Sequence, residues 1–249
     1  MPKSKNNNHY YLFEANNISK YFGGLKATNN VTFHIDNSEI VGLIGPNGAG
    51  KTTLFNLITG FYRPDEGNFY FRGENITGLK PFQICQKGIG RTFQIVRPLK
   101  SLTILENIIT ASLLRHSSYA DAREEALKIA ELTSLENKLE KIAGGIPLPD
   151  KKRLGFAQAL ATGARLLLLD EVAAGLNPKE IDDFLNIVKS VSSQGVAIIM
   201  VEHVMRAVMN IAQHILVLDH GELIAEGAPG DIACNQKVIK AYLGDDYAF

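Results

Sequence analysis

The chain has 249 residues, a length that suits one large α/β domain with room for a subdomain. Its 26 lysines and arginines balance 26 aspartates and glutamates, so overall charge does not draw the protein to nucleic acid or anionic lipid. No apolar run approaches the roughly 20 residues that span a bilayer, and the two cysteines, Cys85 and Cys234, lie too far apart to indicate a disulfide scaffold.

The chain begins with a short polar tail, which is followed by a predicted β layer. Residues 1–10 are rich in lysine and asparagine and contain no apolar core, so we expect a mobile tail and no signal peptide. Residues 12–36 contain β-like patches such as Val31–Ile35, separated by Asn and Gly turns, which predict a small antiparallel layer. The apolar run at 39–44 then predicts a buried strand.

A complete phosphate-binding loop follows that strand. Residues 45–52 read Gly-Pro-Asn-Gly-Ala-Gly-Lys-Thr, and an apolar helix begins directly afterwards. The glycines allow successive N–H groups to point at phosphate oxygens, Lys51 adds a positive charge, and the Thr52 hydroxyl suits Mg²⁺. A glycine-rich turn with no ligand needs neither the lysine nor the threonine. The residues predicted to bind the nucleotide here are Gly45, Pro46, Asn47, Gly48, Ala49, Gly50, Lys51, Thr52 and Thr53.

The rest of the chain alternates strands and helices, with one interruption. After a strand at 68–72, the pattern from 99 to 161 is helical and predicts a helical subdomain. Strands are then expected at 166–169, 196–201 and 215–218, with helices starting at Pro178 and after His203. Apolar strands separated by helices indicate a parallel sheet covered on both faces.

Two acids end the strand at 166–169. Because ligands of open α/β folds bind at the carboxyl ends of the strands, Asp170 is predicted to hold Mg²⁺, directly or through water. Glu171 is the candidate general base that polarises the attacking water. Acids in this place can also be a simple polar strand end, but the phosphate loop upstream favours the catalytic interpretation.

With these motifs in this order, residues 11–249 resemble the ATP-binding cassette (ABC) family of transporter ATPases. The resemblance implies an α/β P-loop NTPase with a RecA-like parallel sheet, an N-terminal antiparallel β layer and an inserted α-helical subdomain at 99–161. It implies ATP and Mg²⁺ as cofactors. It also implies a second ABC ATPase subunit and membrane permease subunits as partners, and no nucleic acid.

Three further residues match family positions. Gln94, in Arg-Thr-Phe-Gln, matches the glutamine that senses the metal and the γ-phosphate, which gives a predicted metal set of Thr52, Gln94 and Asp170. His203 matches the switch histidine, and Phe22 matches the aromatic that stacks on adenine, with Tyr21 as its rival. The alternatives are a solvent-facing glutamine, a structural histidine and a core aromatic.

Two segments depart from the family pattern. Where the family has Leu-Ser-Gly-Gly-Gln, the signature that grips ATP on the opposite subunit, this chain reads Ile146, Pro147, Leu148, Pro149 and Asp150. The serine hydroxyl is absent, the prolines contribute no N–H, and Asp150 adds a negative charge. We nevertheless expect a helix to start there. Asn177 stands where the family often has aspartate in the loop that crosses the dimer, and it also suits a helix capping box.

These departures predict that the chain works best beside a different, related ATPase subunit that supplies an intact signature. Within the family, the chain most resembles ATPases of branched-chain amino acid importers, and of related amide and urea importers, bound to the inner face of the plasma membrane. The supporting stretches are 22–27, 90–94 with 97–99, 170–178 and 241–244. The alternatives are a lipopolysaccharide-export ATPase and, in another class, a cassette ATPase of DNA repair or translation. A regulatory nucleotide-binding module is disfavoured by Glu171 and His203.

Overall fold

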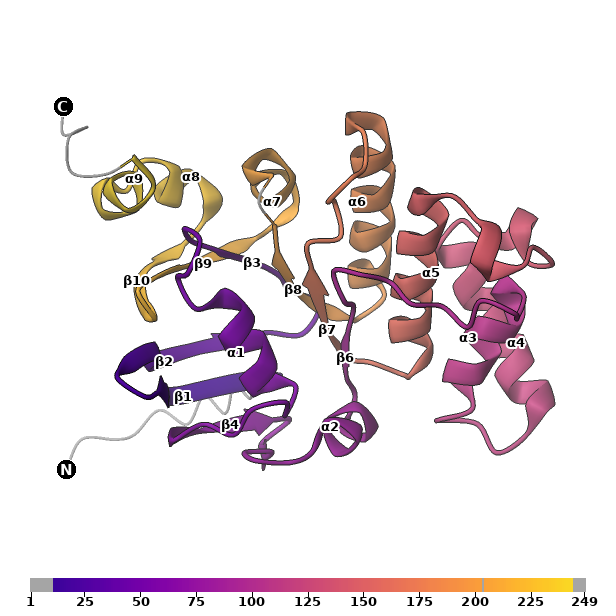
Figure 1. Ribbon diagram of the computed structural model, residues 1–249, viewed down its shortest axis with the longest axis horizontal. Coiled ribbons are helices and arrows are strands. Elements are labelled where there is room, and N and C mark those ends of the chain that lie inside the picture. The colour runs from indigo at the N-terminus through magenta and orange to yellow at the C-terminus, as the bar shows by residue number, and fades with distance from the viewer. Residues whose placement is uncertain (1–10, 203, 244–249) are drawn as a thin grey trace, which may run out of the picture.

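The computed structural model describes residues 11–202 and 204–243. The predicted tail at 1–10 and the predicted switch residue His203 lie outside the described residues. Two sheets organise the described chain (Figure 1). The larger has the strand order β10-β9-β3-β8-β7-β6 and the smaller the order β2-β1-β4-β5. Their bounds are β1 Phe13–Phe22, β2 Leu25–Ile35, β3 Ile40–Ile44, β4 Glu66–Phe71, β5 Glu74–Asn75, β6 Ile89–Arg91, β7 Leu166–Asp170, β8 Ala197–Val201, β9 His214–Asp219 and β10 Glu222–Gly227.

The predicted parallel sheet is present, with one antiparallel strand at its edge. Strands β9, β3, β8, β7 and β6 pair in parallel, whereas β10 pairs antiparallel with β9. A two-residue turn causes this reversal: His220 and Gly221 have φ angles of 44° and 82°, as tight hairpins require. The short strand β6 was not predicted from the sequence, because three residues give too little periodicity to recognise.

Alternating side chains bury both faces of the parallel sheet. On one face, Leu43, Leu166 and Leu168 join a core shared with the antiparallel sheet and helix α1 (Lys51–Ile58). On the other, Leu167 and Leu169 pack beneath α6 (Pro178–Ser193). This two-sided burial explains why the strand sequences read as continuous apolar runs.

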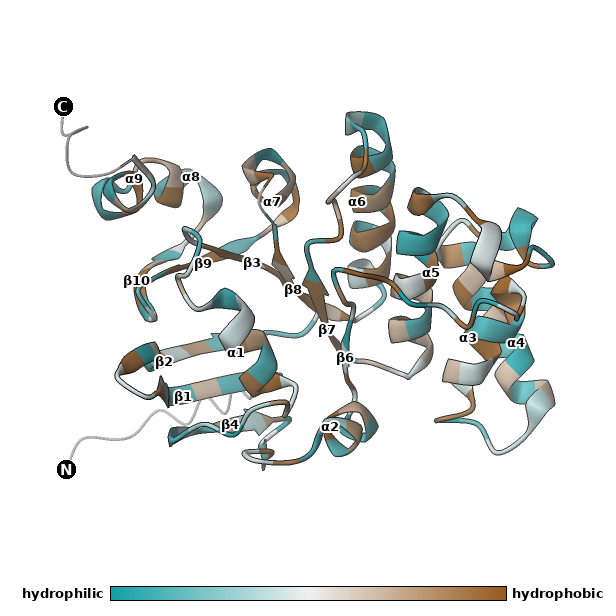
Figure 2. Ribbon diagram, in the orientation of Figure 1, coloured by the Kyte–Doolittle hydropathy of each residue, from teal (hydrophilic) through white to brown (hydrophobic). Residues whose placement is uncertain are grey.

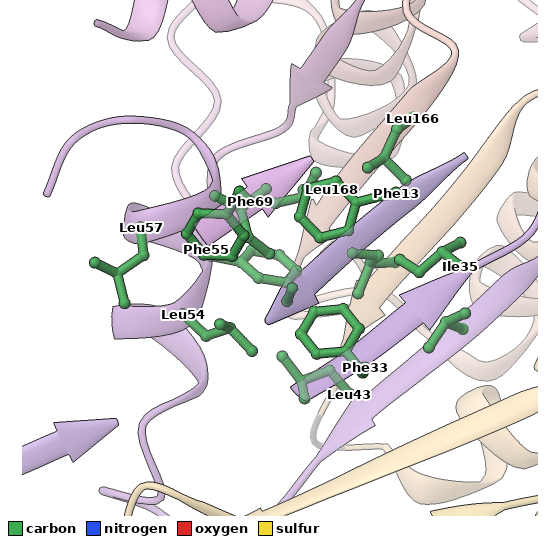
Figure 3. Packing of buried hydrophobic residues seen from close by; sticks show 14 of the residues in the cluster. Phe13, Phe33, Ile35, Leu43, Leu54, Phe55, Leu57, Phe69, Leu166 and Leu168 are labelled. Carbon is green, nitrogen blue, oxygen red and sulfur yellow. The ribbon is translucent and has the colours of Figure 1, made fainter. Parts of the chain in front are cut away.

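The antiparallel layer lies against the phosphate-loop side of the parallel sheet. In Figure 3, the rings of Phe13, Phe33 and Phe69 from this layer meet Phe55 of α1 and Leu168 of the parallel sheet. The ring centroids of Phe13 lie 5.9 Å from Phe33 and 5.7 Å from Phe69. The first core thus fixes α1, and with it the start of the phosphate loop, between two sheets.

A helical region with its own core lies at the opposite end of the molecule from α9 (Figure 1). It comprises α3 Ile104–Ser112, α4 Tyr119–Leu132, two short 3₁₀ helices, Glu136–Lys138 and Ala143–Gly145, and α5 Leu148–Ala161. Figure 2 shows apolar and polar colours alternating along these helices, in contrast to the uniformly apolar β8. The subdomain boundaries at 99 and 161 stay a prediction.

The other helices are α2 Pro81–Lys87, α7 Met205–Ile211, α8 Pro229–Ala233 and α9 Gln236–Leu243. Helices α8 and α9 pack near the β9–β10 hairpin, where Ile232 and Val238 enter a small core with Val217. No helix in the described part of the chain combines the length and hydropathy needed to cross a membrane. Both cysteines are free thiols, Cys85 half-buried and Cys234 exposed.

Candidate active site

Two glycines of the phosphate loop, Gly45 and Gly50, are required by close backbone contacts. Gly45 has φ 149°, and a Cβ there would lie 2.0 Å from the carbonyl oxygen of Leu218. Gly50 has φ 103°, and a Cβ there would lie 2.4 Å from the carbonyl oxygen of Ala27. Neither position admits a side chain, so the loop is held tightly between the β9–β10 hairpin and β2.

Lys51 is folded onto the loop that precedes it. Its side chain is buried, and Nζ donates hydrogen bonds to the carbonyl oxygens of Gly45 (2.7 Å) and Pro46 (2.9 Å). Burial lowers the pKa of the Lys51 ammonium, while the Glu171 carboxylate acts in the opposite direction. The loop bounds a pocket of about 520 Å³ that also involves Leu25, Lys26, Ala27, Glu171 and His220. A cation, loop amides and a carboxylate therefore face one cavity.

Asp170 is held by a buried ion pair at the carboxyl end of β7. Its Oδ2 lies 2.8 Å from an Arg91 guanidinium nitrogen, and the two side chains are 11 % and 8 % exposed. The Asp170 N–H donates to the Thr92 hydroxyl at 3.2 Å. Arg91 also donates to Asn56 at 2.7 Å and lies over the Phe93 ring at 5.3 Å. Asp170 is thus fixed in position by a side chain of the neighbouring strand β6.

Glu171 combines an unusual backbone conformation with several hydrogen bonds. Its φ is 48°, in the left-handed region that a glutamate seldom adopts. The Glu171 N–H donates to the carbonyl of Val201 at 2.9 Å, and its carboxylate accepts a short hydrogen bond from the Gln94 amide. The structure therefore brings the two predicted catalytic side chains, Glu171 and Gln94, into direct contact.

Two buried charged residues, Lys152 and Glu202, bond to the segment that follows β7. Lys152 Nζ donates to the carbonyl oxygens of Gln94 and Glu171, each at 3.1 Å, and burial lowers its pKa while the nearby Glu202, Glu171 and Asp170 carboxylates oppose that shift. Glu202 is also buried and accepts a 2.8 Å hydrogen bond from the Ala173 N–H. Both residues hold the segment that follows β7.

The three predicted metal ligands border a single pocket. Thr52, Gln94 and Asp170 all line a groove of about 810 Å³ beside the phosphate loop. They offer hydroxyl, amide and carboxylate oxygens, the donors that Mg²⁺ prefers. Within the described residues, no three His, Cys, Asp or Glu side chains gather in a way that holds a metal ion. The donor set fits Mg²⁺.

Phe22 lies apart from the phosphate-loop pocket. It ends β1, is 41 % exposed, and packs edge-on against Tyr62 with ring centroids 5.3 Å apart. Neither Phe22 nor Tyr21 lines that pocket, whereas Leu25 does. Phe22 is therefore not a core aromatic, and its contact with adenine stays a prediction.

Comparison with known proteins agrees with this geometry. The sequence pattern of the ABC transporter family matches residues 28–174, more than half of the chain. The chain belongs to the ABC transporter family. A second pattern, described as branched-chain amino acid ATP-binding cassette transporter, matches residues 222–248.

Several relatives of this ABC cassette align over nearly their whole length. The high-affinity branched-chain amino acid transport ATP-binding proteins BraF of Pseudomonas aeruginosa and LivG of Escherichia coli K12 are each 39% identical, covering 94% of this chain and 98% of theirs. A crystal structure of an ABC transporter cassette in its ADP conformation superposes with a TM-score of 0.85 at 32% identity, covering 94% of this chain and 99% of that one. The chain is thus an ABC-type ATPase with the P-loop fold.

In this ABC cassette the segment at the signature position begins a helix, as predicted. Pro147 is the N-cap of α5 and Pro149 lies in its first turn. Leu148 is 43 % exposed, while Ile146 is buried. Asp150 lies in the first turn of α5, and its carboxylate is 3 % exposed and accepts 2.7 and 2.8 Å hydrogen bonds from Lys138.

Asn177 forms the capping box that the sequence suggested as an alternative. Its Oδ1 accepts from the Glu180 N–H at 3.0 Å, and the Glu180 carboxylate accepts from the Asn177 N–H at 2.9 Å. These reciprocal bonds start α6. A contact with a second cassette stays a prediction.

Three residues near the site were not identified from the sequence: Arg91, Lys152 and Tyr242. The Tyr242 hydroxyl, from α9, accepts a 2.7 Å hydrogen bond from the Gly45 N–H. Arg91 and Tyr242 gave no local signal, since their partners are 79 and 197 positions away in sequence. Lys152 did have a local sequence signal, because it lies on the same side of the helix as Phe156 and Ala159, which face the sheet.

Proposed function

We propose that this chain is the ATP-hydrolysing subunit of a branched-chain amino acid importer. The observation that carries the proposal is the meeting of Lys51, Asp170, Glu171 and Gln94 around one phosphate loop. The solute class is supported by the family pattern at 222–248 and by the names of the relatives. The ATPase itself does not touch the solute.

The residues divide the work of hydrolysis. Loop N–H groups and Lys51 hold the β- and γ-phosphates, and Glu171 polarises water for attack on the γ-phosphate. Thr52, Asp170 and Gln94 would hold Mg²⁺, which neutralises negative charge on the phosphates when bound. The hydrogen bond from the Gln94 amide to the Glu171 carboxylate supports this assignment, because the proposed phosphate sensor and the proposed base would then act together. His203 is proposed as the switch residue from its sequence position alone.

A different ATPase subunit is proposed as the partner. Pro147 and Pro149 supply no N–H donors, and Leu148 presents an apolar side chain where the family signature has glycine. This face offers a γ-phosphate little to bind. The chain therefore hydrolyses its own ATP against the partner's intact signature.

A groove beside Gln94 is the proposed docking place for the permease. Phe93, Ile95 and Val96 line it, and Ile95 and Leu99 are 69 % and 45 % exposed. Ile95 and Leu99 are thus not packed inside the protein. Docking there places the chain at the inner face of the plasma membrane.

The test is reconstitution of the transporter in proteoliposomes. The chain is purified with permease subunits and a second cassette subunit, and uptake of radiolabelled leucine is measured with ATP inside the vesicles. We expect ATP-dependent uptake that Lys51→Ala abolishes. ATP-dependent movement of urea or short amides, with none of leucine, would overturn the assigned solute.

A further inference from the structure

One buried ammonium joins two loops of the active site. Lys152 is 4 % exposed and lies in the first half of α5. It bonds the main chain of the loop that carries Gln94 and the main chain of the loop that carries Glu171. A single side chain from the helical region thus fixes both catalytic residues relative to each other.

The position of Lys152 on α5 explains this reach. Leu154, Ala157 and Ala161 pack in the core of the helical region, whereas Phe156 and Ala159 pack in the core under the parallel sheet. Lys152 precedes Phe156 by one turn and so shares the stripe that faces the sheet. A helix buried on two sides holds this lysine rigidly.

The Glu171 carbonyl needs such a partner. With φ at 48°, the residue is strained, and that conformation persists only when its surroundings hold it. Hydrogen bonds to other described residues fix its main chain: the N–H donates to Val201, and the carbonyl accepts from Lys152 and, at 3.3 Å, from the Ala174 N–H. Lys152 supplies the charged one, and charge-assisted bonds are the stronger kind.

We propose that Lys152 is a positioning residue for ATP hydrolysis, which holds Glu171 in its left-handed conformation and couples α5 to the Gln94 loop. This inference rests on the proposed function of the site. It gives the helical region a direct route to the base: when α5 rotates, both carbonyl oxygens bonded to Nζ must follow. The orientation of the Glu171 carboxylate toward the phosphate-loop pocket then depends on the position of α5.

The experiment compares Lys152→Met, Lys152→Arg and the control Lys189→Met, whose lysine is exposed on α6. Each variant is assembled with its partner subunits, and kcat, KM for ATP, binding of a fluorescent ATP analogue and Tm are measured. We expect Lys152→Met to lower kcat by about 100-fold, the cost of a misplacement near 1 Å. KM and analogue binding should change little, because the phosphate loop is untouched.

The remaining variants separate positioning from folding. Methionine fills the lysine's space but leaves the carbonyl oxygens of Gln94 and Glu171 without their charged donor, so Tm should fall somewhat while nucleotide binding persists. Lys152→Arg keeps the charge and two donors, so it should recover part of kcat. A crystal structure of Lys152→Met should show φ of Glu171 relaxed to a negative value.

Wild-type kcat in Lys152→Met with φ of Glu171 still near 48° would overturn the inference. A parallel loss of kcat, nucleotide binding and Tm would overturn it as well, because it would indicate a purely structural lysine. If the wild-type assembly fails to hydrolyse ATP while Lys152→Met still relaxes Glu171, the proposed function fails instead.

Discussion

At the scale of the residue, charged side chains at this site are held by partners far away in sequence. Asp170 depends on Arg91, and Glu171 depends on Gln94 and Lys152. None of these partners is adjacent to the acid it holds. Chemistry at the end of β7 is therefore set by β6, by the loop after it and by α5.

Glu171→Gln tests the base directly. The amide keeps the size of the side chain but cannot accept a proton, so turnover should fall by about 10²- to 10⁴-fold, the usual contribution of a general base. Binding of a fluorescent ATP analogue should persist, since the loop amides and Lys51 are unchanged. Glu140→Gln, at an exposed position of the helical region, serves as the control. Unchanged turnover in Glu171→Gln would reject the role of Glu171.

Arg91→Met tests the buried ion pair. Removing one partner leaves the Asp170 carboxylate buried without its counter-charge, so the free energy of unfolding should fall by about 3–5 kcal/mol. Chemical denaturation monitored by circular dichroism measures this loss. The double variant Arg91→Met with Asp170→Asn should recover most of it, because no uncompensated charge remains. A double variant as unstable as the single one would show that the guanidinium acts through packing alone.

At the scale of the element, α9 is attached to the phosphate loop. Its Tyr242 hydroxyl accepts the N–H of Gly45, the same residue whose carbonyl accepts from Lys51. Burial raises the pKa of the Tyr242 phenol above its ordinary value, which keeps the hydroxyl neutral. The C-terminal helix thus contributes directly to the order of the loop.

Tyr242→Phe should lower the free energy of unfolding by about 1–3 kcal/mol, because the buried Gly45 N–H loses its acceptor. The raised folded-state pKa fixes the sign of the pH dependence. This stability is fully present below the unfolded pKa of 10.0 and is lost as pH rises through the folded value. Urea denaturation of both proteins at several pH values checks it, with Tyr119→Phe on the helical surface as control. If the difference in the free energy of unfolding between wild type and Tyr242→Phe grew above pH 10, the assignment would be contradicted.

Elements with strong local patterns could be predicted, and pairings between distant segments could not. Strand β7 could be predicted as a buried strand because both of its faces are apolar. The phosphate loop could be recognised from its glycines and lysine. Strand β6 escaped notice because its three residues gain their place by pairing with β7. The inward turn of Asp150 depends on Lys138, whose position follows only from the packing of the helical region.

At the scale of the whole molecule, the cassette is complete on one face and altered on the other. The loop, Asp170 and Glu171 form the complete face. The segment at 146–150 forms the altered face, with two prolines and an exposed leucine. This asymmetry is the basis of the proposed assembly with a different cassette.

Size-exclusion chromatography of Glu171→Gln with ATP and Mg²⁺ tests this asymmetry. Blocked hydrolysis keeps ATP intact and so would favour a dimer. The chain alone should nevertheless remain monomeric, because the altered segment of neither copy can bind phosphate. Adding Pro147→Ser, Leu148→Gly, Pro149→Gly and Asp150→Gln should produce an ATP-dependent homodimer, since the new segment offers a hydroxyl and two further N–H donors. A stable homodimer of the chain with its own segment would refute the need for a different partner.

The hydrogen bonds that Lys51 makes to its own loop affect the thermodynamics of ATP binding. Its ammonium is bonded to two carbonyl oxygens of its own loop, so contact with a triphosphate is an exchange reaction in which phosphate oxygens replace carbonyl oxygens. The number of hydrogen bonds to the lysine is nearly conserved, and the gain comes from trading a dipole for an anion. Discrimination follows from this exchange: a ligand must carry enough negative charge to outcompete the main chain, which a nucleoside triphosphate does and a neutral nucleoside does not.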